Sequence, residues 1–359
     1  MEARRFVVYR LQLLRGTCII AVIATHVTEG YREIAMGWLA TGLIYANSLA
    51  RFAVPVFVLL SGFYLSLNSR NQQALVFYRR TLRFLVGPYV LYSFLYTLVF
   101  EMPSLPLAAL PRTIARTLAF GNAAYHLWFM LLVLELYAVH PFLARWYRAR
   151  DHRGAVVLLA FGVQIIWPSV LQLDLLPHGR LSTLAFKGLA FLSYLGYFLA
   201  GYHLHDYADV VVGMLRQTRS IIIGAIVWLL TGAGVGLHWA APLAGDTPFE
   251  DAAGQDLVLW LLLPMLSIAA LPVILKCAET AGAAQNLAGR ALSSFGLFSY
   301  GVYYLHPLVL VLLSSLLWRY AHLDYDDGLY YAAVFPSVCI LSLGAVRILS
   351  KTPFGRYLT

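Results

Sequence analysis

The chain has 359 residues, of which 60% are hydrophobic and only 12% are charged, and its formal net charge is +9. A soluble globular domain has roughly a quarter of its residues charged, so this composition excludes an ordinary water-soluble protein and predicts a surface that faces lipid. The basic residues do not interleave with polar surface, so no nucleic-acid partner is expected. The three cysteines lie in separate apolar runs without paired spacing, and no metal site is expected.

The apolar runs predict about ten transmembrane helices, because a hydrocarbon core about 30 Å thick needs about 20 apolar residues per helix. The runs lie at residues 11–28, 44–67, 82–101, 126–144, 154–173, 183–204, 219–239, 256–276, 292–317 and 329–349. The connecting segments are short and no internal repeat is visible. We therefore expect an all-α polytopic membrane helical bundle, with residues 1–359 forming a single transmembrane domain and no appended soluble domain.

The distribution of arginine and lysine predicts the orientation of these helices. Basic residues concentrate in alternate connecting segments such as RWYRARDHR at 145–153, whereas GDTPFEDAAGQD at 245–256 is acidic. Cytoplasmic loops carry the excess of basic residues in membrane proteins, so both ends of the chain are expected in the cytoplasm. The expected location is the plasma membrane, which is the inner membrane in a bacterium, crossed many times.

The first apolar run contains RGTCIIAVIATH, with Arg15 and His26 at its two ends. Eleven residues make almost three helical turns, so both side chains lie on one face, about 16 Å apart along the axis. Arg15 alone is explained equally well as an interfacial anchor that extends toward water. An ionisable pair on one face of a span more often faces a cavity or a partner, and it predicts a functional site.

Further polar residues lie at similar depth in other runs. Glu135 is near the middle of the fourth run, and His306 is midway along the ninth. Each by itself could be a packed polar residue that is hydrogen-bonded to serine or tyrosine. Together with Arg15 and His26, they favour a polar site enclosed by the bundle.

Three arginines, Arg79, Arg80 and Arg83, lie in FYRRTLRFLVGPY on the predicted cytoplasmic side of the third run. Arg80 and Arg83 are three residues apart and so share a helical face. Guanidinium groups suit phosphate recognition. The alternative is that these arginines only set the topology, as basic residues of inner loops do.

In this order, six segments resemble the acyltransferase-3 family, integral-membrane enzymes that acylate surface carbohydrates. They are LLRGTCIIAVIATH, VPVFVLLSGFYL, YRRTLRFLVGPY, YHLWFMLLVLELY, YLGYFLAGY and SYGVYYLHP, and the resemblance covers nearly the whole chain. It implies that Arg15 and His26 match the family's essential pair in the first helix. It also implies that Arg80 and Arg83, or Arg79 in place of Arg80, match its basic motif after the second helix.

The resemblance implies transfer of an acyl group, usually acetyl from cytoplasmic acetyl-CoA, to a sugar hydroxyl, with no metal. We expect Arg15 and the arginines at 79–83 to bind the phosphates of CoA. His26 is expected to act as general base on the hydroxyl or to carry the acyl group itself. Glu135 or His306 is expected to orient His26 or the acceptor.

The expected partners are a carbohydrate acceptor and membrane lipids, and a homo-oligomer is compatible with the sequence. The Trp128 ring is expected to stack against the sugar or the thioester. Tyr125 and His126 are expected to bind the acceptor together with it. The main alternative is a proton-coupled transporter or flippase of a polar solute, because such carriers also contain midspan histidines and carboxylates. A purely structural membrane subunit is a third interpretation.

Overall fold

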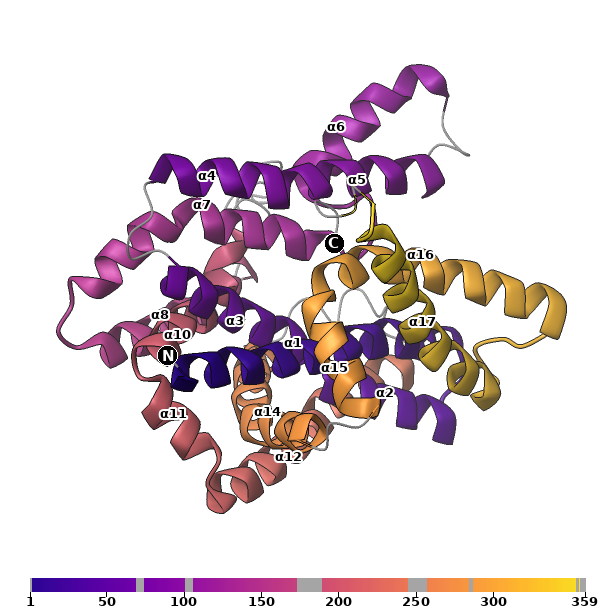
Figure 1. The fold of residues 1–359 in the computed structure, drawn as a ribbon. Helices are drawn as coiled ribbons and strands as arrows, with labels where there is room; N and C mark the ends of the chain where they lie inside the picture. Colours follow the sequence, from indigo (N-terminus) through magenta and orange to yellow (C-terminus); the bar gives the residue numbers. More distant parts are fainter. Residues whose placement is uncertain are drawn as a thin grey trace. The chain divides into compact units, whose positions relative to one another are not determined.

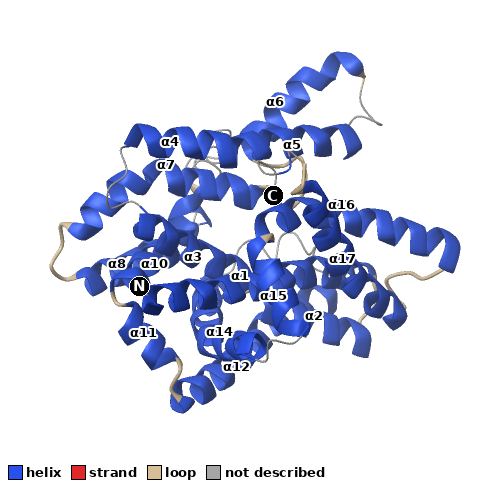
Figure 2. Cartoon of the chain, in the orientation of Figure 1, coloured by secondary structure: helices blue, strands red, loops and turns tan. Residues whose placement is uncertain are grey.

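The structure is a computed structural model that describes residues 2–68, 74–100, 106–172, 189–244, 257–283, 287–352 and 355. Within these ranges the regular elements are helices and there is no strand (Figure 2). The helices are α1 (Glu2–Thr28), α2 (Trp38–Ala50), α3 (Ala53–Asn68), α4 (Ala74–Thr81), α5 (Gly87–Phe100), α6 (Leu110–Phe120), α7 (Trp128–Arg148), α8 (Arg153–Gln172), α10 (Leu195–Asp206), α11 (Ala208–Leu215), α12 (Thr218–Ala244), α14 (Leu257–Ala283), α15 (Leu287–Leu297), α16 (Ser299–Leu316) and α17 (Gly328–Leu349). Short 3-10 turns occupy Glu29–Glu33, Leu107–Ala109 and Ala190–Tyr194, and π turns occupy Leu82–Val86 and Leu317–Ala321.

Eight helical stretches in the described part of the chain are long and apolar enough to cross a membrane. They are Tyr9–Glu33, Trp38–Leu67, Leu75–Phe100, Trp128–Arg148, Thr218–Ala240, Leu259–Gly282, Ser299–Ala321 and Gly328–Leu349. The predicted run at 154–173 forms α8, whose apolar part, Arg153–Pro168, is shorter. Residues 183–188 of the predicted run at 183–204 lie outside the described residues. The predicted polytopic helical bundle is therefore confirmed, and the chain is an integral membrane protein.

The chain divides into two compact units, with one boundary within α3 and the other directly after α10. The first unit comprises Met1–Phe57 and Tyr207–Tyr357, and the second comprises Val58–Asp206. In the first unit α1, drawn in indigo in Figure 1, packs against α2, α14, α15, α16 and α17. Because α1 touches so many neighbours, the polar residues along it meet side chains from several different helices.

Two glycines allow α1 and α15 to meet backbone to backbone. A Cβ atom on Gly16 would lie 2.2 Å from the carbonyl oxygen of Leu292, and one on Gly296 would lie 2.0 Å from that of Gln12. The side-chain amide of Gln12 also donates to the carbonyl oxygen of Ser293 at 3.1 Å. Small residues permit such close helix packing in membranes. This contact fixes the rotation of α1 about its axis and therefore the direction in which Arg15 and His26 point.

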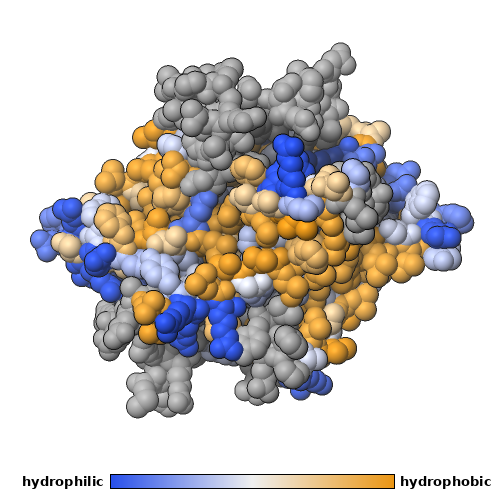
Figure 3. Space-filling model, turned by 90° about the horizontal axis from the view of Figure 1, so that it is seen from above, coloured by the Kyte–Doolittle hydropathy of each residue, from blue (hydrophilic) through white to orange (hydrophobic). Residues whose placement is uncertain are grey.

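The outer side of α12 shows why this unit needs lipid around it. Its exposed side chains include Ile222, Ile226, Leu229, Leu230 and Leu237. Figure 3 shows large apolar areas among the described residues on the face that it draws. Exposed apolar surface of this extent is favourable against hydrocarbon and unfavourable against water.

A second close approach joins α3 and α10 in the second unit. A Cβ atom on Gly62 would lie 2.1 Å from the carbonyl oxygen of Phe198, and one on Gly201 would lie 2.1 Å from that of Leu59. The segments VPVFVLLSGFYL and YLGYFLAGY, which are far apart in the sequence, therefore meet at this crossing.

Polar contacts tie α10 to α7 and α8. Arg153 Nη1 lies 2.6 Å from Asp206 Oδ2, and the Tyr147 hydroxyl lies 3.2 Å from His203 Nδ1. Such partners compensate polar groups that would otherwise be costly next to hydrocarbon. They hold the second unit together at the ends of these helices.

Candidate active site

Two contacts between α1 and α16 bring together three of the predicted site residues. Arg15 Nη2 donates to the Ser299 hydroxyl at 2.8 Å, and the His26 and His306 rings stack with their centroids 5.4 Å apart. Both contacts run in the same order along the two helices, so α1 and α16 lie parallel. The paired residues are separated by about 16 Å on α1 and by about 10 Å on α16. The Arg15 side chain is long enough to make up the difference between these two separations.

His306 has a defined tautomer in this arrangement. Its side chain is fully buried, and its Nδ1 lies 3.0 Å from the carbonyl oxygen of Val302. A carbonyl oxygen can only accept, so Nδ1 of a neutral His306 carries the hydrogen and Nε2 is the basic nitrogen. The ring is held both by this bond and by the stack on His26.

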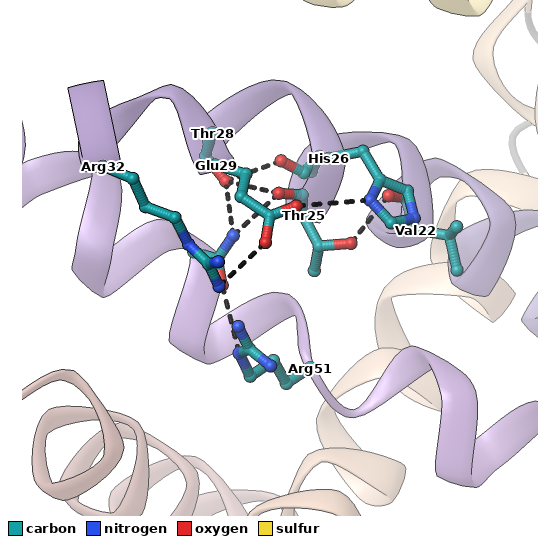
Figure 4. Close-up of polar contacts among 9 residues, drawn as sticks. Val22, Thr25, His26, Thr28, Glu29, Arg32 and Arg51 are labelled. Atoms are coloured by element: carbon teal, nitrogen blue, oxygen red, sulfur yellow. Dashed lines mark hydrogen bonds and ion pairs between the residues drawn. The ribbon is translucent and has the colours of Figure 1, made fainter. Parts of the chain in front are cut away.

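His26 is followed by Glu29, a carboxylate that is not among the residues predicted for the site. α1 ends at Thr28, and the chain continues as the 3-10 turn that begins with Glu29. Glu29 Oε2 lies 3.7 Å from His26 Nδ1, and Glu29 Oε1 accepts from Arg32 Nη2 at 2.9 Å. Figure 4 shows Glu29 between these two side chains. The three-residue spacing from His26 was the signal in the sequence that could have identified Glu29.

The side-chain amide of Asn47 on α2 links Arg51 to the same turn of α1 by hydrogen bonds. Asn47 Nδ2 donates to the Thr25 carbonyl oxygen at 2.7 Å and to the Thr28 hydroxyl at 3.1 Å. Asn47 Oδ1 in turn accepts from Arg51 Nε at 3.1 Å. The guanidinium of Arg51 lies over the Trp239 ring, 4.7 Å from its centroid. No local pattern in the sequence indicates Arg51 and Trp239, because each reaches this turn through a contact between separate helices.

Four predicted site residues lie in the second unit, around α7. Glu135 Oε2 accepts from the backbone amide of Phe191 at 3.0 Å. The other three lie among aromatic rings: His126 is buried beside Tyr96 and Tyr125, and the half-exposed Trp128 ring lies 6.1 Å from that of Tyr194. Within the described residues, no group of three or more His, Cys, Asp or Glu side chains is arranged as metal ligands. The catalytic and acceptor-binding roles of these residues stay predictions.

The three arginines of the predicted phosphate site also lie in the second unit. Arg79 and Arg80 are in the last turn of α4, and Arg83 is in the π turn that follows. All three side chains are exposed, and the Arg83 guanidinium lies 5.6 Å from the centroid of the Phe84 ring. A π turn shifts the register of a helix and often marks a functional site. Their role as phosphate ligands stays a prediction.

Comparison with known proteins assigns the chain to a family. The model of an acyltransferase domain, that of the acyltransferase-3 family, matches residues 8–347, which is nearly the whole chain. No curated protein and no solved structure matches the chain. The matched region includes both members of the stacked histidine pair, and the match favours an enzyme over a transporter. The chain belongs to the acyltransferase-3 family and is a membrane acyltransferase.

Proposed function

We propose that the protein transfers an acetyl group from cytoplasmic acetyl-CoA to a hydroxyl of a cell-surface or lipid-linked carbohydrate, with His26 as the general base. The observation that carries this proposal is the His26 imidazole, stacked on His306 with Glu29 3.7 Å from its Nδ1, in an acyltransferase. A sugar hydroxyl is a weak nucleophile at neutral pH and needs a positioned base. The proposed location is the plasma membrane, the inner membrane in a bacterium, with both chain ends in the cytoplasm.

In the proposed reaction the neutral His26 ring takes the proton of the acceptor hydroxyl as the oxygen attacks the thioester carbonyl carbon. A C–O bond forms, the C–S bond breaks, and the CoA thiolate takes the proton from the imidazolium. Glu29 orients the ring and stabilises its charged form, the part that a carboxylate plays beside a catalytic histidine. In the alternative, His26 accepts the acetyl group first and passes it to the hydroxyl.

Arginine side chains are proposed to bind the charged, phosphate-bearing end of the donor. Arg15 lies three helical turns from His26, a separation that suits a pantetheine arm on the order of 15–20 Å long. Exposed guanidinium groups form charge-assisted, often bidentate, bonds with phosphate, which supports Arg79, Arg80 and Arg83 as ligands of the CoA phosphates.

The acceptor is proposed to contact aromatic side chains of the second unit. Trp128 and Tyr125 are 41% and 48% exposed, so their rings are available for stacking on a sugar. His126 lies against Tyr125 and is grouped with them. Glu135 is proposed to orient the acceptor. Membrane lipids surround the protein, and a homo-oligomer is compatible with the proposal.

The test is release of free CoA thiol from acetyl-CoA by protein purified in detergent, with and without a carbohydrate acceptor. We expect His26→Ala to lower the rate by about 100-fold or more, because removal of a general base removes a factor of about 10²–10⁴. His152→Ala, which alters an exposed histidine between α7 and α8, is the matched control and should match the wild type. CoA release that is equally fast in His26→Ala would overturn the role of His26, and folded wild type that neither binds nor consumes acetyl-CoA would overturn the donor.

A further inference from the structure

Arg51 is a charged side chain that forms no ion pair with a carboxylate among the described residues. It is partly buried at the end of α2, within a stretch that is long and apolar enough to cross a membrane. Among the described residues, no carboxylate lies within ion-pair distance of it, although Glu29 and Tyr31 act on it electrostatically. A guanidinium has five N–H donors; Asn47 accepts from the one on Nε, the Tyr31 side chain is a further hydrogen-bond partner, and donors remain for a ligand. A charge in such a place marks a functional site by default.

Trp239 gives the guanidinium a flat apolar support. The Arg51 guanidinium lies 4.7 Å from the centroid of the Trp239 ring, and that of Arg32 lies 5.8 Å from the same centroid. Stacking on an aromatic face restricts the plane of a guanidinium while its N–H edge stays able to bind. A tryptophan ring is also a good surface for the apolar face of a sugar.

The position of Arg51 relative to His26 is set by a chain of hydrogen bonds. Asn47 accepts from Arg51 Nε and donates to Thr25 and Thr28, which lie one residue before and two residues after His26 on α1. Arg32 is joined to His26 through Glu29. Figure 4 shows both arginines beside the end of α1. A group bound by Arg51 would therefore be held next to the proposed base.

From this arrangement we propose that Arg51, supported by Trp239 and assisted by Arg32, binds an anionic group of the acceptor, a carboxylate or a phosphate. The acceptor is then an acidic or phosphorylated sugar whose reacting hydroxyl lies close to its charge. This inference rests on the proposed acyl transfer to a carbohydrate and names the class of that carbohydrate. Planar bidentate contact with the guanidinium edge suits both oxyanions.

The test is a binding measurement that needs no acyl transfer. Purified protein in a neutral detergent is titrated with glucuronate, glucose 6-phosphate and glucose, and binding is followed by calorimetry. The variants are Arg51→Gln, Arg51→Lys and, as the matched control, Arg319→Gln, which removes an exposed arginine that lies over the Tyr320 ring. Thermal unfolding of each variant is measured in the same detergent.

We expect one or both anionic sugars to bind the wild type and Arg319→Gln at least tenfold more tightly than glucose does. In Arg51→Gln this preference should fall by about ten- to a hundredfold, since bonds to charged groups are the stronger ones, and Arg51→Lys should lie between. Preference for glucuronate alone or for glucose 6-phosphate alone identifies the anion as carboxylate or phosphate. Arg51→Gln should still unfold cooperatively, because the glutamine amide can keep a hydrogen bond to Asn47, and this shows that lost binding is not lost folding.

Anionic sugars that bind no better than glucose, or that bind Arg51→Gln as well as the wild type, would overturn the inference. So would a large rise in the KM for acetyl-CoA in Arg51→Gln, which would assign the guanidinium to the donor. If anionic sugars bind through Arg51 but CoA is never released, the anion site is supported and the proposed acyl transfer is overturned. If CoA release depends on His26 but anionic sugars do not bind, the acyl transfer is supported and the anion site is overturned.

Discussion

The imidazole rings of His26 and His306 stack at a centroid distance of 5.4 Å with their planes inclined by 25°. The two residues come from α1 and α16, at opposite ends of the sequence, and His306 is fully buried. The stack restricts the plane of the His26 imidazole, so the proposed base is positioned by a buried ring from the other end of the chain.

The carboxylate beside His26 can be tested by replacing it with its amide. We expect Glu29→Gln to lower kcat by about tenfold or more while the KM for acetyl-CoA stays near the wild-type value, because the carboxylate orients the base and does not contact the donor. Rates of CoA release at several acetyl-CoA concentrations separate the two parameters. Glu33→Gln changes an exposed carboxylate in the same turn and should leave both unchanged. If KM rises and kcat does not fall, Glu29 is not a positioning residue.

The chemical role of His306 can be separated from its packing. In His306→Phe a ring of similar size keeps the stack on His26 but has no nitrogen, so we expect near wild-type thermal stability and CoA release lower by about tenfold. In His306→Ala we expect lower stability as well, because loss of a large buried side chain costs about 3 kcal/mol. Full activity in His306→Phe would show that the buried ring contributes packing alone.

Variants of the exposed arginines in α4 and in the π turn after it can distinguish a role in donor binding from a role in setting the topology. We expect the double variant Arg80→Gln, Arg83→Gln to raise the KM for acetyl-CoA by about tenfold or more with little change in kcat, since each charge-assisted bond contributes about 1.5–3 kcal/mol. The difference from the wild type should shrink at high salt, because exposed charges are screened. Arg112→Gln, which alters an exposed arginine of α6, is the control. An unchanged KM would leave topology as their only role.

The glycine crossing of α3 and α10 gives a prediction about stability. In Gly62→Ala the new Cβ would meet the Phe198 carbonyl oxygen at 2.1 Å, so the helices must separate. Overpacking of this kind costs about 1–3 kcal/mol, and we expect the melting temperature in detergent to fall by several degrees. Gly154→Ala adds the same atom in α8 where nothing lies within 4 Å, and it should melt at or above the wild-type temperature. Equal melting temperatures for the two variants would contradict this crossing.

Local features of the sequence were sufficient for several correct predictions. The helical class and eight of the predicted spans follow from apolar runs, because a lipid-exposed helix satisfies its own backbone and only needs length and hydropathy. The resemblance carried by six segments agrees with the family match over residues 8–347. That Arg15 and His26 share a helical face follows from the helical repeat alone.

Composition, hydropathy and the order of the motifs were therefore enough to identify a helical membrane acyltransferase with an ionisable pair on one face of its first helix. What that face meets depends on how the helices pack. Ser299 lies 284 residues from Arg15, and no local period reports such a pairing. Gly16 and Gly296 set the rotation of α1 by backbone contact, and this rotation brings His26 against His306. Arg51 and Trp239 reach the same turn through contacts between separate helices, whose rotation and crossing depend on packing against every neighbour at once.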